Sequence, residues 1–109
     1  MQNYQGDVLL AKVSEEKVKD IQFKPLSKEG QIVAEGETTG HFHCVVVEER
    51  SNATVEVGKD ANGFYFNIKG GNAVIEHNTH EKQIMTPGIW FVTTQFEYDE
   101  IEERKKVQD

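Results

Sequence analysis

Gly63-Phe64-Tyr65-Phe66-Asn67-Ile68-Lys69 is the stretch that decides the fold, because its side chains alternate with a period of two. Phe64, Phe66 and Ile68 fall on one face, and more polar residues fall on the other. This alternation is typical of a half-buried β-strand, whose successive side chains point to opposite faces of a sheet. The stretch therefore predicts a strand with one face toward a core.

The segments on either side of this strand predict two more strands. Gly70-Gly71-Asn72 contains residues that adopt turn conformations at little cost, and Ala73–His77 follows at hairpin spacing. Upstream, Thr54–Val57 alternates in the same way and ends at Gly58, and residues 60–63 form the connecting loop. Together the three segments predict a three-stranded meander.

Four further strands are predicted elsewhere, at residues 7–13, 31–34, 41–47 and 89–98. Residues 14–20 suit a turn or two of helix, and residues 24–30 suit a loop. Short strands separated by regular turn signals predict an all-β fold, a small antiparallel barrel or sandwich of the cupin or jelly-roll kind. The length of 109 residues fits one domain, which we assign to residues 1–98, followed by a charged segment at 99–109.

Charge narrows the classes of partner. The net charge is −7, and residues 31–103 contain thirteen acidic residues but only four basic ones. Such a surface repels phosphate backbones and anionic lipids, so we expect no nucleic acid and no membrane as a partner. The first residues lack the basic and apolar regions of a signal peptide, which predicts a cytoplasmic protein. The single cysteine, Cys44, is interpreted as a small buried apolar residue.

The four histidines provide the strongest chemical signal, because all of them lie in two short segments. His41 and His43 are two residues apart on a predicted strand and so share one face. Phe42 and Cys44 fall on the opposite face, and the apolar character of both faces predicts a central strand. His77 ends another strand, and a turn at residues 78–79 would bring His80 to the same point.

Several imidazoles that converge on one point suggest a divalent transition metal, such as Zn, Fe, Mn or Ni. Glu37, Glu49 or Glu81 would complete the ligand shell or act as a base on bound water, and Glu49 is favoured over Glu48 because it is in phase with His43. In the competing interpretation, each histidine is an ordinary buried side chain with a hydrogen-bond partner. The carboxylates would then be solvated surface charges.

Two resemblances rest on these residues. His41-Phe42-His43, followed by Glu48 and later by Pro87-Gly88, resembles the first motif of the cupins, β-barrels that bind a metal through three histidines and a glutamate. No histidine follows Gly88, so the cupin site extends only to His41, His43 and Glu48. A strand at residues 6–13 is also similar to one in co-chaperonin barrels.

The broader resemblance covers nearly the whole chain. Residues 36–43, with the motif Gly-Glu-Thr-Thr-Gly-His-Phe-His, and residues 77–81 before Pro87-Gly88 look like an uncharacterised family of small bacterial and phage-associated proteins. The resemblance implies that the two histidine motifs belong together and makes a phage or prophage origin plausible. It transfers no activity.

Two hypotheses about function follow. The first is a metal-binding β-barrel protein, either an enzyme or a binding module, with a small-molecule ligand left open. The second is a non-catalytic assembly or accessory protein whose histidines are structural. In both cases exposed strand edges and apolar residues such as Trp90, Phe96 and Tyr98 predict a homo-oligomer, a dimer by preference.

Overall fold

The computed structural model describes residues 3–5, 8–35, 42–48, 50–77 and 82–94. Within them the chain forms ten strands and one short 3-10 helix, η1 (Glu15–Val18). The strands are β1 (Asn3–Gln5), β2 (Val8–Val13), β3 (Lys24–Pro25), β4 (Gln31–Glu35), β5 (Phe42–Val47), β6 (Thr54–Asp60), β7 (Gly63–Lys69), β8 (Ala73–His77), β9 (Lys82–Met85) and β10 (Gly88–Thr94). The described part contains no helix that is long and apolar enough to cross a membrane.

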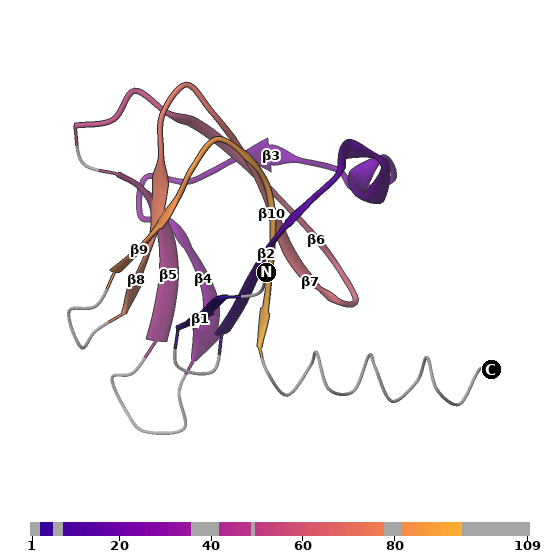
Figure 1. Cartoon of the computed structure of the whole chain (residues 1–109), viewed down its shortest axis with the longest axis horizontal. Coiled ribbons are helices and arrows are strands. Elements are labelled where there is room, and N and C mark those ends of the chain that lie inside the picture. Colours follow the sequence, from indigo (N-terminus) through magenta and orange to yellow (C-terminus); the bar gives the residue numbers. More distant parts are fainter. Residues whose placement is uncertain (1–2, 6–7, 36–41, 49, 78–81, 95–109) are drawn as a thin grey trace.

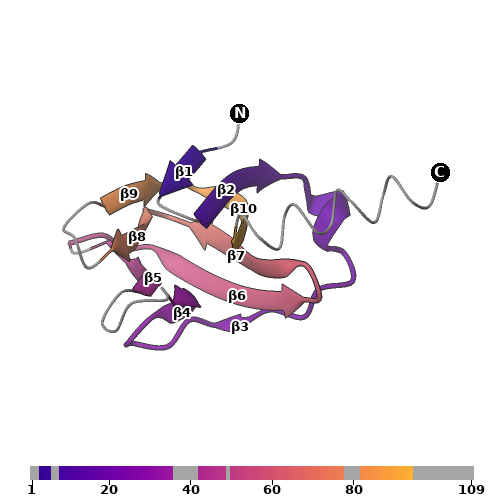
Figure 2. The same cartoon turned by 90° about the horizontal axis from the view of Figure 1, so that it is seen from below.

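The strands form two antiparallel sheets that face each other. One sheet has six strands in the order β1-β2-β10-β7-β6-β3, and the other has four in the order β4-β5-β8-β9. In Figure 1, β8, β5 and β4 stand at the left and β10, β7 and β6 at the right, and Figure 2 shows the same layers from below. The predicted all-β, antiparallel class is confirmed. Of the two predicted architectures, the described strands form a sandwich of two open sheets and not a closed barrel.

The core lies between the two sheets. The six-stranded sheet contributes Val57, Phe66 and Ile68, and the other sheet contributes Val45 and Ile75, all of them nearly inaccessible to solvent. Full burial of one such side chain stabilises a fold by about 1.5–3 kcal/mol. The alternation at residues 63–69 correctly placed Phe66 and Ile68 on the core face of β7, whereas Tyr65 on the other face is buried as well.

The predicted three-stranded meander is wrong. β6 pairs with β7 as expected, but the next neighbour of β7 is β10, and β8 instead lies between β5 and β9 in the other sheet. Gly70-Gly71-Asn72 is thus the crossing from one sheet to the other. Gly70 has a φ of 77°, which a glycine adopts at no steric cost. The same residue types are suitable for a hairpin within one sheet and for a connection between two sheets. The local sequence therefore could not distinguish the two.

Other boundaries differ by small amounts. β7 and β8 match their predicted ranges, whereas β6 continues past Gly58 to Asp60. A Cβ atom on Gly58 would lie 2.9 Å from the carbonyl oxygen of Gln22, so this glycine allows close packing and does not end the strand. β1, β3 and β9 were not predicted. The C-terminal part of the predicted strand 89–98 and the charged segment 99–109 lie outside the described residues.

Asp60 organises the hairpin between β6 and β7. Its Oδ1 accepts hydrogen bonds from the backbone N–H groups of Asn62 (2.8 Å) and Gly63 (3.2 Å), and its Oδ2 accepts one from the Tyr65 hydroxyl (3.0 Å). Burial, together with the charge and hydrogen bond of Asp60, raises the pKa of Tyr65 to about 12. The phenol therefore stays protonated and remains a donor in the neutral pH range.

We expect Asp60→Ala to lower the free energy of unfolding by about 1–3 kcal/mol, because three donors lose a charged acceptor. Asp60→Asn is the matched control, since its amide oxygen still accepts the two turn hydrogen bonds, and it should lose less than half as much. Urea denaturation followed by Trp90 fluorescence measures both. Equal stability of Asp60→Ala and the parent chain would contradict this role of Asp60.

Candidate functional site

His43 is the best-described member of the predicted histidine cluster. It lies on β5, which has β4 and β8 as neighbours, so the predicted central position of this strand is confirmed. The residue is 6% exposed. Its side chain points to the face of β5 opposite to that of Cys44. This is the inner face of the sheet, which it shares with Val45, a fully buried core residue. A histidine thus occupies a position on the inner face, where the neighbouring strand positions are apolar.

The strand register places His77 directly opposite His43. The two are Cα partners in the antiparallel ladder between β5 and β8. Residues that are directly opposite each other share a face of the sheet and have Cβ atoms about 4.5–5.5 Å apart. The two histidine segments are 34 positions apart in the sequence, and the ladder unites them at one point. In general, two histidines at directly opposite positions of a ladder are close enough for both to bind one ion, because metal–nitrogen bonds are about 2.0–2.1 Å long.

The other predicted ligands, His41, His80, Glu37 and Glu49, lie outside the described residues, as does Glu81. Within the ranges that are described, no three side chains of His, Cys, Asp or Glu form a group that could hold a metal ion.

Glu48 lies just beyond the end of β5. The strand ends at Val47, and a turn follows in which the N–H of Ser51 donates to the carbonyl oxygen of Glu48 (3.0 Å). Arg50 within this turn has a φ of 70°. The period-two alternation, which favoured Glu49 over Glu48, therefore does not extend past Val47. Glu48 lines a groove on the outer face of the sheet instead.

Cys44 lies on the opposite face of β5 from His43, as the phase of the strand predicted. It is buried, and its thiol donates a weak hydrogen bond to the carbonyl oxygen of Glu29, with an S–O distance of 3.6 Å. Burial, and secondarily the negative charge of Glu76, raises the pKa of the Cys44 thiol. Since the thiolate is the form that binds metals and reacts, the interpretation of Cys44 as a small buried side chain is supported.

The outer face of the four-stranded sheet is a feature that the sequence analysis missed. Ile32 is 47% exposed and Ile84 is 53% exposed. Val74 lies on β8 and is the Cα partner of Val46 on β5 and of Ile84 on β9. These three residues form an apolar row across the sheet and line a groove of about 520 Å³. Glu76 and Lys82 face each other beside the row with a 3.4 Å ion pair. Residues 41–47 have apolar side chains on both faces of the strand, and this pattern could have predicted an apolar outer surface.

Comparison with known proteins places the chain in a family. Residues 4–95 match the family described as a domain of unknown function (DUF8820), and the chain belongs to this family. No curated protein and no solved structure matches the chain. The expectation of an uncharacterised family is confirmed to this extent.

The raised pKa of Cys44 predicts slow alkylation of the folded protein. Because the folded-state pKa lies above the unfolded value, the thiolate fraction at pH 8 is lower in the folded chain than in the unfolded one. We expect iodoacetamide to modify Cys44 at least tenfold more slowly in the native protein than in 6 M urea, as measured by intact-mass spectrometry. The difference should narrow as pH rises toward 10. Equal rates at pH 8 would contradict the buried, protonated thiol.

Proposed function

We propose that this protein binds a divalent transition metal between β5 and β8, with His43 and His77 as the central ligands. The observation that carries the proposal is their direct opposition in the β5–β8 ladder. The buried setting of His43 supports it further, since an enclosed, neutral imidazole is a good ligand for Zn, Fe, Mn or Ni.

Covalent geometry limits how far His41 and His80 can lie from this point. One residue spans at most about 3.6 Å of extended chain, so His41 starts within about 7 Å of His43 and His80 within about 11 Å of His77. Either imidazole can supply a third nitrogen. Glu37 and Glu81 are the carboxylates that could complete the shell, whereas Glu49 follows the end of β5 that lies farther from His43.

The number of protein ligands decides what the metal does. Four protein ligands make a closed, structural site, whereas three leave one position for water or substrate. An open position would give the protein Lewis-acid or hydrolytic chemistry, with a glutamate as a base on the bound water. The proposal is therefore a metal-binding β-sandwich protein, catalytic only if the shell is open.

Metal binding should raise the melting temperature. An ion that binds only the folded chain adds RT ln(1 + [L]/Kd), which is about 2.7 kcal/mol at a hundredfold excess over Kd. We expect Zn²⁺ or Mn²⁺ to raise the melting temperature of chelator-treated protein by several degrees at pH 7.5. Protons compete with the metal for imidazole, so the increment should shrink at pH 5.5. Differential scanning fluorimetry measures both effects.

Two variants test the ligand assignment. His43→Ala should lose most of the increment, whereas Cys44→Ala, the next residue on the opposite face of β5, should keep it. Isothermal titration calorimetry with Zn²⁺ gives the stoichiometry independently of stability. If neither metal nor chelator changes the melting temperature and no heat of binding is found, the histidines are structural and the metal proposal is wrong.

A second candidate function, a non-catalytic assembly or accessory role, is favoured by the outer face of the four-stranded sheet. Ile32 and Ile84 leave a large part of their apolar surface in water on this face. The groove on this face is lined by two acids, Glu48 and Glu76, and by Lys82, which pairs with Glu76. In a two-fold dimer the same apolar patch of each copy would cover the other, and Lys82 of one copy could face an acid of its partner. The proposed assembly is a homodimer through this face.

The dimer proposal predicts a concentration-dependent mass. We expect sedimentation velocity at micromolar concentration to give a dimer, and Ile84→Asp to shift it to monomer by placing a charge in the apolar interface. Lys69→Asp, an exposed change on β7 in the other sheet, should leave the dimer intact. A monomer throughout the micromolar range would rule out this assembly. A dimer that Ile84→Asp does not affect would place the interface elsewhere.

A further inference from the structure

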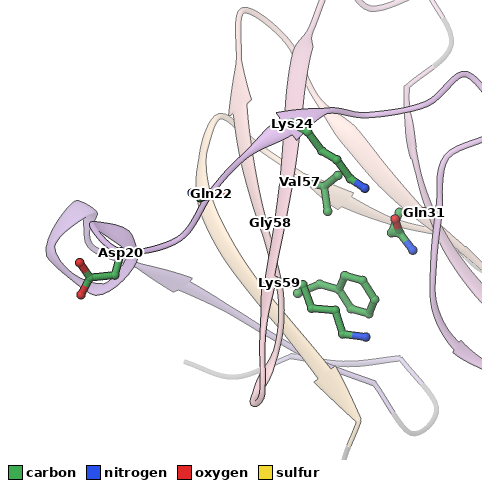
Figure 3. A pocket seen from close by; sticks show the side chains of 8 residues that line it. Asp20, Gln22, Lys24, Gln31, Val57, Gly58 and Lys59 are labelled. Atoms are coloured by element: carbon green, nitrogen blue, oxygen red, sulfur yellow. The ribbon is translucent and has the colours of Figure 1, made fainter.

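A second cleft opens between the two sheets, away from the outer groove. It has a volume of about 600 Å³ and is lined by residues of β3, β4, β6 and β7 together with the segment after η1. Figure 3 shows Lys24 and Lys59 extending toward the side of β6 on which Gln31 lies, while Asp20 lies on the other side. Two cationic side chains thus line one cleft in a chain with a net charge of −7.

Strand register places Lys24, Lys59 and Gln31, three of the polar side chains that line the cleft, on the inner face of the sandwich. Lys24 is the Cα partner of Val57, a core residue, and Gln31 is the Cα partner of Val45, another core residue. Lys59 follows Val57 by two residues on β6 and therefore shares its face. The other residues on the inner face of β6 and β7 are apolar. The cleft is therefore the part of this face that carries cationic and amide groups.

The cleft also has an apolar wall. Val57 is buried, and Phe64 packs partly against the core cluster. Phe64 is the Cα partner of Lys59, and the Lys59 ammonium lies 4.9 Å from the centre of the Phe64 ring. An aromatic ring in this position attracts the cation to its face and at the same time offers hydrocarbon surface to a ligand.

We propose that this cleft binds a small organic carboxylate, which no part of the metal proposal requires. The carboxylate would accept charge-assisted hydrogen bonds from Lys24 and Lys59, and the amide of Gln31 would supply a further donor. The hydrocarbon body of the ligand would lie against Phe64 and Val57. The lining is mainly polar, so the lysines would hold the carboxylate by charge while Val57 and Phe64 supply a single apolar wall.

The charges around the cleft favour an anion of this kind over a polymer. Asp20 is the acidic group among the described lining residues, and Figure 3 shows it apart from the two lysines. The acidic surface of the chain as a whole disfavours nucleic acids, which need extended basic surfaces. A monocarboxylate needs only the local field of two ammonium groups, and an open cleft of this size can accommodate a small organic ligand.

A titration with 2-naphthoate, followed by amide chemical shifts of ¹⁵N-labelled full-length protein, tests the proposal. We expect saturable shifts centred on Gly58 and Lys59. The neutral analogue 2-naphthamide should bind at least tenfold more weakly because it lacks the charge, and acetate should bind at least tenfold more weakly because it lacks the hydrocarbon body. Shifts centred elsewhere, or equal affinity for naphthoate and either analogue, would overturn the proposal.

Variants identify the groups responsible. Lys59→Gln and Lys24→Gln should each weaken naphthoate binding by about tenfold, the expected effect of losing one charge-assisted hydrogen bond. Lys69→Gln, an exposed lysine on the same sheet that does not line the cleft, should leave the affinity unchanged. An equal effect of all three changes would indicate general electrostatic attraction and would overturn the site. The absence of any binding would overturn the proposal. Lys24 and Lys59 would then serve only to prevent another chain from pairing with the β3 edge of the sheet.

Discussion

Burial of the two inner sheet faces against each other is the constraint on which the other features depend. Phe66 and Ile68 from one sheet and Val45 and Ile75 from the other are excluded from water together, and neither sheet could bury its apolar face alone. This packing decides which residue of each strand points inward. It therefore also decides where a histidine or a lysine on that face must lie.

The two proposed sites are departures from the apolar inner face, and each has a distinct physical origin. At the β5–β8 ladder, His43 takes an inner position opposite His77, where burial keeps an imidazole away from solvent. At the cleft, Lys24 and Lys59 occupy inner positions at the margin of the sandwich and are exposed, so their ammonium groups stay hydrated. A buried imidazole suits a metal ion, and an accessible cation suits an anion.

The outer face of the four-stranded sheet leaves apolar side chains exposed to solvent. Its counterpart in the larger sheet is partly covered, since Gly58 on β6 packs against Ile21 and Gln22. No described segment covers Ile84 in this way, and the residue stays more than half exposed. Self-association is a common means of removing such a surface from water, and it would leave the inner-face sites available. Metal binding and assembly are thus compatible within one protein of the DUF8820 family.

The sequence by itself determined the local features of this protein. The alternation in residues 63–69 predicted β7 and its buried face, the apolar residues on both faces of 41–47 predicted a central strand, and the clustering of histidines selected His43 as a candidate ligand. Each of these depends on neighbours within a few residues, for which the period-two geometry of a strand is sufficient.

Only the tertiary structure decided which strands are neighbours. Gly70-Gly71-Asn72 permits a hairpin and a crossing alike, and the pairing of Ile75 with Val45, not with β7, selects the crossing. The same long-range ladder brings His77 opposite His43, and another places Lys24 opposite Val57. β3 and β9 are too short to carry a periodic signal and form by pairing with existing strands. Contacts between residues distant in sequence depend on burial of the whole core, which no local pattern encodes.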